Sequence, residues 1–223
     1  MIAIAIDGPS GAGKSSIARS LAGQMGYVYI DTGALYRAIG LYALEHGVEP
    51  TDREKVPALL PQITLELRHR QDGQHVYLNG RDVSEEIRTP AVSMAASGVS
   101  AIPEVRAFLL ELQQGIAAKQ NVIMDGRDIG TVVLPGAQVK IFLTASSEER
   151  ARRRYQELLA KGKDVAYEQV LADVIERDRN DSTRAIAPLR PAPDAVTVDT
   201  TGNDFEQSVS QLRSVIEEKL AAL

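Results

Sequence analysis

The chain has 223 residues with a formal net charge of −5, and 44% of its residues are hydrophobic and 25% charged. This length allows one large domain with a substantial core, and the composition is ordinary for a globular protein. The negative charge, the absence of tryptophan and an aromatic content of 4% argue against nucleic acid as a partner. The absence of cysteine excludes disulfides and cysteine metal sites.

No membrane-spanning or secretory pattern is visible in the sequence. No apolar run reaches the ~20 residues that a membrane helix needs. The N-terminus has no basic leader and meets Asp7 after a short apolar run, which does not fit a signal peptide. With the absence of cysteine, these features predict a cytoplasmic protein without a membrane partner.

The first predicted element is a buried strand over residues 2–7, which runs directly into a glycine-rich loop. That loop fits the G-x-x-x-x-G-K-[ST] pattern, and apolar residues at helical spacing follow it. Its glycines let successive backbone N–H groups surround phosphate oxygens, and the helix dipole adds positive potential there. We therefore expect a nucleoside triphosphate to bind at Gly8, Pro9, Ser10, Gly11, Ala12, Gly13, Lys14, Ser15 and Ser16, with Lys14 at the β- and γ-phosphates and Ser15 as a ligand of Mg²⁺.

Strands and helices alternate along most of the chain. Strands are expected at residues 2–7, 27–31, 121–125, 139–144 and 195–199, and helices at 33–45, 103–119, 147–161, 167–179 and 205–220. This alternation predicts an α/β fold, a parallel sheet with helices on both faces. Residues 63–68 and 75–80 instead alternate apolar and polar positions around a turn-like Gln71-Asp72-Gly73-Gln74, which predicts a small antiparallel insertion over residues 62–90.

Four of the predicted strands end in aspartate: Asp7, Asp31, Asp125 and Asp199. Open α/β sheets bind ligands at the carboxyl edge of their strands, although a helix cap is an equal alternative for each aspartate. Asp125 ends an apolar strand, as the Walker B aspartate does, and we expect it near Mg²⁺.

Polar residues that follow two of these strands are candidates for binding a second, phosphorylated substrate. Thr32, Tyr36 and Arg37 fall in the first turns of a helix; a capped helix with solvated polar residues is the alternative. The sequence Asp31-Thr32-Gly33 also occurs in aspartic proteases. Their active site needs two such aspartates, and the chain has no good second copy of the motif. Arg127 can hold phosphate and Asp128 can accept from an exocyclic amino group, or the two form a plain ion pair.

Arginines are dense between residues 150 and 190. Phosphoryl transfer needs cations that close over the transferring group. We expect at least one of Arg152, Arg153 and Arg154 to do this and select Arg153, so that residues 150–163 form a lid. A solvated helix face, paired with acidic residues of the same helix, is the alternative.

Several motifs in order resemble the bacterial type of cytidylate kinase, a nucleoside monophosphate kinase of the P-loop class. They are the loop at residues 8–15, Asp-Thr-Gly-Ala-Leu-Tyr-Arg at 31–37, Val-Ser-Glu-Glu-Ile-Arg at 83–88, Asp-Gly-Arg-Asp-Ile-Gly-Thr at 125–131, Lys-Ile-Phe-Leu-Thr-Ala-Ser at 140–146, and Glu-Arg-Asp at 176–178 with Arg-Ala-Ile-Ala-Pro-Leu at 184–189. The likeness runs from Met1 to about Leu220. It implies a three-layer P-loop kinase fold over residues 1–223, with a five-stranded parallel sheet and the small insertion, and transfer of the γ-phosphate of ATP to CMP or dCMP with Mg²⁺.

The resemblance also implies roles for individual residues. Ser97, Arg106 and Asp128 would read the cytosine; Arg177 and Asp181 would meet the sugar; Arg37, Arg127 and Arg184 would hold the acceptor phosphate, near Tyr36 and Thr32. We expect the catalytic set to be Lys14, Arg127, Arg153 and Arg184. Two positions depart from the family pattern: Thr32 stands where serine is also common, and residues 181–184 are less basic than in some relatives.

Three alternatives stay open at this point. The first is that the chain is a related kinase whose acceptor is UMP, AMP or dephospho-coenzyme A. A regulatory GTP switch would need an Asn-Lys-x-Asp motif, and the chain contains no Asn-Lys pair. A nucleic-acid-stimulated ATPase conflicts with the charge and the few aromatics. We expect a monomer whose insertion closes over the acceptor and whose lid closes over ATP.

Overall fold

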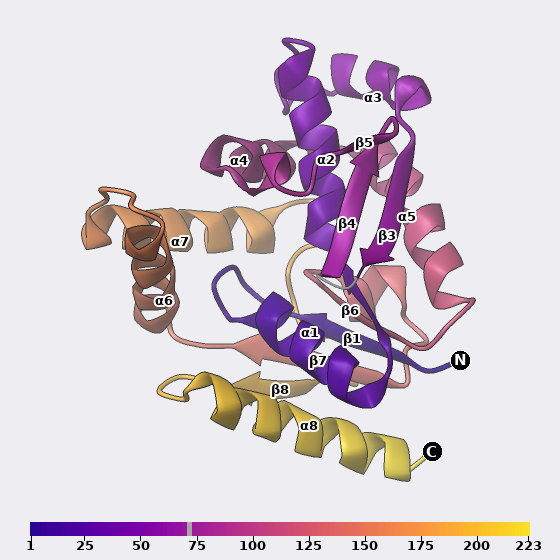
Figure 1. Cartoon of the computed structure of the whole chain (residues 1–223), viewed down its shortest axis with the longest axis vertical. Coiled ribbons are helices and arrows are strands. Elements are labelled where there is room, and N and C mark those ends of the chain that lie inside the picture. Colours follow the sequence, from indigo (N-terminus) through magenta and orange to yellow (C-terminus); the bar gives the residue numbers. More distant parts are fainter. Residues whose placement is uncertain (71–72) are drawn as a thin grey trace. The chain divides into compact units, whose positions relative to one another are not determined.

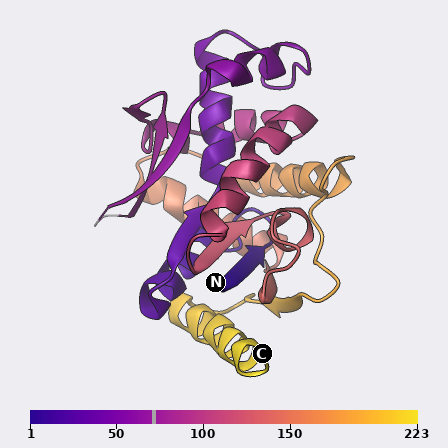
Figure 2. The same ribbon diagram turned by 90° about the vertical axis from the view of Figure 1, so that its right-hand side faces the viewer.

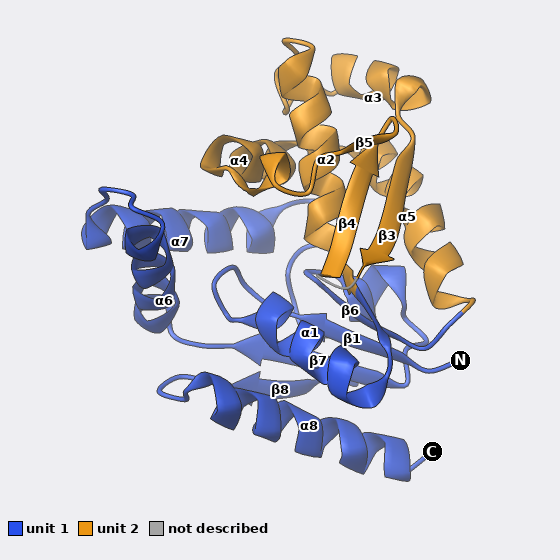
Figure 3. Cartoon of the chain, in the orientation of Figure 1, with its two compact units in different colours: residues 1–29, 120–223 blue, residues 30–119 orange. Residues whose placement is uncertain are grey.

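The computed structural model describes residues 1–70 and 73–223. The chain forms two compact units (Figure 3). Unit 1 comprises Met1–Tyr29 and Gln120–Leu223, and unit 2 comprises Ile30–Lys119. None of the helices in the described parts of the chain has the length and apolar character that crossing a membrane requires.

A five-stranded sheet carries unit 1 (Figure 1). The strands, in spatial order, are β2 (Val28–Asp31), β6 (Val122–Gly126), β1 (Ala3–Asp7), β7 (Val139–Thr144) and β8 (Val196–Asp199). β1 runs parallel to both neighbours, with Ile6 opposite Asp125 on one side and Ile141 on the other. The parallel register places the carboxyl ends of β1, β6 and β7 at one edge, where open α/β sheets bind ligands.

The helices of unit 1 form two groups. α1 (Lys14–Met25) and α8 (Phe205–Ala221) bury Ile17, Leu21, Leu212 and Ile216 against apolar strand residues such as Ile4, Ile123, Ile141 and Val198. α6 (Ser147–Ala160) and α7 (Tyr167–Thr183) pack on each other around Ala151, Val170 and Val174. Tyr155 and Tyr167 add an edge-to-face contact between these two helices, with ring centroids 5.9 Å apart.

Unit 2 contains helices and an antiparallel sheet. The helices are α2 (Thr32–Glu45), α3 (Lys55–Leu59), α4 (Pro90–Val99) and α5 (Pro103–Ala117). β3 (Leu65–Arg70) pairs with β4 (Gly73–Leu78), and β4 pairs with β5 (Arg81–Asp82). Figure 2 shows the twisted ribbon of β3 and β4 from the side. Two residues of the predicted turn, Gln71 and Asp72, lie outside the described residues.

The predicted fold class is confirmed: the parallel sheet has five strands flanked by helices, and a separate sheet of three antiparallel strands is present. Sequence patterns missed the helices α3 and α4. α4 is rich in alanine, serine and glycine, and its buried residues are Val92, Ala95, Ala96 and Val99. Thr89 caps the helix by accepting from Val92 N–H. Its small residues allow close packing on α2, since a Cβ on Gly40 would lie 3.0 Å from Ala95 Cβ.

Candidate active site

The glycine-rich loop connects β1 to α1, and its three glycines, Gly8, Gly11 and Gly13, all have the positive φ that favours glycine. Gly11 has φ +77°, and Gly8 has φ +152° with no room for a side chain, since its Cβ would lie 2.0 Å from the carbonyl oxygen of Leu143. All nine residues from Gly8 to Ser16 therefore belong to one compact turn and the first turn of α1. Such a turn places backbone N–H groups and a helix N-terminus where they bind anionic oxygens.

Lys14 lies inside this turn rather than in solvent. Its side chain is buried, with 6% of the residue exposed, and its Nζ donates to the carbonyl oxygen of Pro9 at 2.7 Å. Burial, followed by the positive charge of Arg127, lowers the pKa of Lys14 to about 7. Arg177 acts in the same direction, and Asp125 and Asp181 oppose it. A polyanion bound to the loop would restore the proton to this ammonium.

A hydroxyl and a carboxylate meet beside the loop. Ser15 Oγ donates to Asp125 Oδ2 at 2.9 Å, and Tyr29 Oη donates to Asp125 Oδ1 at 2.8 Å. Mg²⁺ prefers oxygen ligands and is often held by one or two protein groups together with substrate phosphates. The Ser15–Asp125 pair therefore fits a magnesium ion shared with a nucleotide. Within residues 1–70 and 73–223, no cluster of three or more His, Asp or Glu side chains offers an all-protein metal site.

Two ion pairs in unit 1 contain four of the predicted acceptor-binding residues. Arg127 Nε lies 2.8 Å from Asp181 Oδ2, and Arg184 Nη2 lies 3.7 Å from Asp128 Oδ1. Burial opposes ionisation of Asp181, but the charge and hydrogen bond of Arg127 prevail and hold the pKa of that carboxyl below its usual value. The sequence left open an ion pair between Arg127 and Asp128, but each pairs with a residue of the segment 181–184 instead.

These contacts bring most of the predicted site residues of unit 1 together. The charges of Arg127 and Arg177 act on both Lys14 and Asp181. Cationic and acidic side chains therefore gather close to Lys14 of the phosphate loop. Clusters of this kind bind and neutralise phosphoryl groups.

The predicted acceptor-binding residues of unit 2 form a group of their own. Asp31 accepts from Ala34 N–H as the cap of α2 and also pairs with Arg37, whose Nη2 lies 2.7 Å from Asp31 Oδ2. Thr32, the next residue, is 3% exposed. Arg37 Nε is buried and has no hydrogen-bond partner within the described residues. The helix-cap alternative for Asp31 is therefore observed, and a role of this carboxylate in ligand binding stays a prediction.

Tyr36, Ser97 and Arg106 lie on three different helices of unit 2. Arg106 Cζ lies 5.7 Å from the ring centroid of Tyr36, a cation–π distance. Arg106 Nη1 also donates to the carbonyl oxygen of Ser100 at 3.2 Å, and the Ser100 hydroxyl donates to the carbonyl of Ser97. α2, α4 and α5 therefore bring these polar residues into one connected set.

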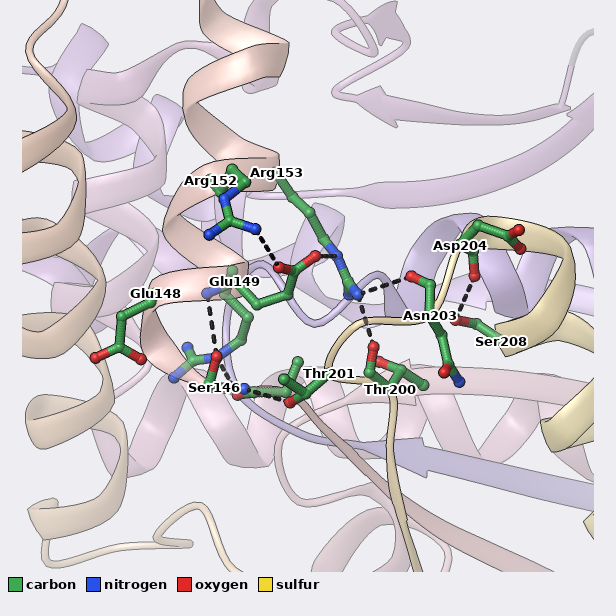
Figure 4. A network of polar contacts seen from close by, with 12 residues as sticks. Ser146, Glu148, Glu149, Arg152, Arg153, Thr200, Thr201, Asn203, Asp204 and Ser208 are labelled. Atoms are coloured by element: carbon green, nitrogen blue, oxygen red, sulfur yellow. Dashed lines mark hydrogen bonds and ion pairs between the residues drawn. The ribbon is translucent and has the colours of Figure 1, made fainter.

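The arginines of α6 differ sharply in their surroundings (Figure 4). Arg152 is 62% exposed at its side chain and bonds only with Glu149 among the described residues. Arg153 also contacts Glu149, but its Nη2 donates to the carbonyl oxygens of Thr200 at 2.8 Å and Asn203 at 3.3 Å. Arg154 pairs with Glu157 on the helix surface. Arg153 alone of these three points into unit 1, between the loop before α8 and the phosphate loop at Gly13.

Sequence patterns missed a fourth arginine, Arg150, which is 3% exposed. It donates to the carbonyl oxygen of Ser10 at 2.9 Å and forms a two-bond pair with Asp178 on α7. The backbone of Gly11 also lies close, since a Cβ there would be 3.1 Å from Arg150 Cβ. The sequence of a dense run of arginines does not show which of them is buried. Only the tertiary contacts distinguish Arg150 from its neighbours.

A parallel sheet whose first strand ends in a phosphate loop, with a hydroxyl–carboxylate pair and converging arginines beside it, defines a P-loop phosphotransferase. Residues 4–218 match the cytidylate kinase family. The cytidylate kinase of Carboxydothermus hydrogenoformans is 54% identical over 216 residues, which are 97% of each chain. That of Bacillus subtilis is 47% identical over 218 residues, 98% of this chain and 97% of the relative. The chain belongs to the cytidylate kinase family.

The fold is also similar to that of a solved structure whose function is uncharacterized. A protein from Eubacterium ventriosum superposes with a TM-score of 0.52 at 11% identity, covering 97% of this chain and 99% of that one. Identity this low supports a shared fold and nothing finer.

Proposed function

We propose that the protein transfers the γ-phosphate of ATP to CMP or dCMP and releases ADP with CDP or dCDP. The observation that carries this proposal is the cluster of unit 1, in which the phosphate loop and Lys14 share an electrostatic environment with Arg127, Arg177 and Asp181. A protein that bound only a triphosphate would not need arginines such as Arg127 and Arg177 in addition to the phosphate loop. Family membership supplies the identity of the base.

ATP is the proposed donor, bound through its phosphates at residues 8–16. Lys14 would contact the β- and γ-phosphates, and Ser15 and Asp125 would hold Mg²⁺. When bound, the ion neutralises part of the charge on those phosphates. The backbone N–H groups of the loop orient the same oxygens, because the glycine conformations fix their direction.

The proposed acceptor contacts follow the chemistry of each side chain. Arg37, Arg127 and Arg184 are proposed to bind the acceptor phosphate, with Thr32 and Tyr36 as hydroxyl donors. Arg177 and Asp181 are proposed to contact the sugar, and Ser97, Arg106 and Asp128 the cytosine. Asp128 is an acceptor for the exocyclic amino group of cytosine, whereas uracil presents a carbonyl at that position.

Catalysis on this proposal is positioning and charge neutralisation. Lys14, Arg127, Arg153 and Arg184 would stabilise the charge on the transferring phosphoryl group while the acceptor oxygen lines up with the γ-phosphorus. No side chain needs to act as a general base. Residues 62–90 are proposed as the monophosphate-binding insertion and residues 150–163 as a lid, so that water is excluded until the acceptor binds. A cytoplasmic monomer remains the expectation from sequence.

The test is to follow ADP formation from Mg-ATP with and without CMP and to identify the second product. The proposal expects ADP and CDP in equal amounts, and little ADP when CMP is absent. A regulatory switch or a motor would hydrolyse its triphosphate regardless of CMP. Nucleotide hydrolysis that CMP does not stimulate would therefore reject the proposal.

A further inference from the structure

The last residue of β1, Asp7, has a buried carboxylate that none of the roles above uses. Asp7 is 3% exposed. Its Oδ1 accepts from Ile129 N–H at 2.8 Å and its Oδ2 from Gly130 N–H at 2.7 Å. The two donors are separated from Asp7 by more than a hundred residues of chain, so the contact is purely tertiary.

The two N–H groups open a short π-helical turn, η3 (Ile129–Val133). Within this turn Val132 N–H and Val133 N–H donate back to the carbonyl oxygen of Asp128. The first N–H groups of any helical turn lack partners inside it. Asp7 supplies the missing acceptors, one carboxylate oxygen for Ile129 N–H and the other for Gly130 N–H. The backbone that follows Asp128 is thereby fixed to the end of the central strand β1.

Arg127 and Asp128 immediately precede the turn that Asp7 holds. Their side chains are held from the other side, by Asp181 and Arg184. The segment is therefore fixed at its backbone by Asp7 and at its side chains by the end of α7 and the residue after it. Without the Asp7 contacts, the backbone after Asp128 would lose the two hydrogen bonds that join it to the end of β1.

We propose that Asp7 is a positioning residue for acceptor selection: its carboxylate orients the segment that presents Arg127 and Asp128. This inference rests on the proposed function, because it assigns Asp128 to the cytosine. The inference concerns the direction in which the Asp128 carboxylate points. Discrimination between bases depends on this direction more strongly than overall binding does.

Burial supports the importance of the two bonds. A buried carboxylate is costly unless hydrogen bonds satisfy it, and burial raises the pKa of Asp7 to about 6 while the bonds from Gly130 and Ile129 oppose the rise. An asparagine here keeps the size of the side chain but offers one oxygen and one NH₂ group. The NH₂ group would face an N–H donor, so one of the two bonds is lost.

Asp7→Asn is the test, with Asp52→Asn as the matched control. Asp52 also accepts two backbone N–H groups, from Glu54 and Lys55, at a helix start that carries no predicted site residue. The readout is the ratio of kcat/KM for CMP to kcat/KM for UMP, in which the fraction of folded enzyme cancels. A merely structural role for Asp7 would leave this ratio unchanged.

We expect Asp7→Asn to lower the ratio about tenfold or more and to change the KM for ATP by less than about threefold. Asp52→Asn should alter neither value. An unchanged ratio in folded Asp7→Asn would overturn the inference. If this variant does not fold, amide hydrogen exchange of the wild type decides: slow exchange at Ile129 and Gly130 supports the contact, and rapid exchange overturns it. A wild type that does not phosphorylate CMP would instead reject the proposed function.

Discussion

Arg127 and Asp181 form an ion pair across 54 residues of sequence, with Nε and Oδ2 at 2.8 Å and side chains 20% and 8% exposed. The pair joins the segment after β6 to the end of α7. A buried carboxylate beside the guanidinium fixes its plane before any substrate arrives. Preorganisation of this kind lets an arginine meet a phosphate without paying for side-chain ordering at that moment.

Replacing Arg127 by alanine is expected to impair the acceptor side. The substitution removes the proposed phosphate contact and takes from the buried Asp181 carboxylate its ion pair with Arg127. We expect the KM for CMP to rise about tenfold or more and kcat to fall about a hundredfold, with a much smaller change in the KM for ATP. Arg213→Ala, which removes an exposed pair with Glu217 on α8, is the control. An unaltered KM for CMP would contradict the role given to Arg127.

Lys14 is expected to make the stability of the ligand-free protein depend on pH. Its pKa is about 7 in the folded protein against an ordinary value of 10.5, so between these values the unfolded chain binds more protons. The free energy of unfolding therefore rises with pH in this window. Relative to Lys14→Met, the wild type should gain about 1–3 kcal/mol between about pH 7 and pH 9 in urea titrations. Parallel pH profiles for the two proteins would show that Lys14 keeps its proton.

Asp125 is expected to set the magnesium requirement of the reaction. Asp125→Asn should raise the Mg²⁺ concentration for half-maximal rate about tenfold or more, since an amide oxygen binds the cation less well. Tyr29→Phe is the matched control, because it removes one hydrogen bond to Asp125 and leaves the carboxylate in place. It should shift the requirement less than about threefold. Equal shifts in both variants would mean that the carboxylate itself does not bind the ion.

Arg153 and Arg152 allow a direct comparison of neighbouring arginines on α6. Arg153→Ala is expected to lower kcat about a hundredfold, because Arg153 is directed toward the phosphate loop and the loop before α8. Arg152→Ala should change kcat less than about threefold, since an exposed pair on a helix contributes little. The reverse order of effects would give the catalytic role to Arg152.

The sheet and its helices were predictable because local signals agreed with the tertiary structure. Apolar runs at parallel-strand length, four of them ending in aspartate, predicted the five strands of the parallel sheet within a residue or two of the observed bounds. α4 was not predicted, because its buried face consists of two valines and two alanines, a weaker apolar signal than the leucines and isoleucines of helices such as α1 and α8. It is stabilised by its cap and by close contact with α2, which a single-sequence pattern does not contain.

The candidate site was predictable in its residue types but not in its pairings. The residues that follow the third predicted strand pointed to Arg127 and Asp128 as site residues, and the family resemblance pointed to Asp181. Which arginine pairs with which carboxylate depends on contacts between the end of β6 and the end of α7. Lys14 shows the same limit: the motif predicts a lysine in the phosphate loop, but only the folded turn shows that its side chain is buried. Asp7 carries a strand-end signature, although its partners lie on a distant turn.

The most direct test of the account is the ratio of kcat/KM for CMP and UMP, measured with Mg-ATP on the wild-type protein. The account predicts a preference for CMP of about a hundredfold or more, because the proposed acceptor Asp128 would face the carbonyl of uracil, which has no hydrogen to donate to it. Comparable efficiency with the two nucleotides would contradict it.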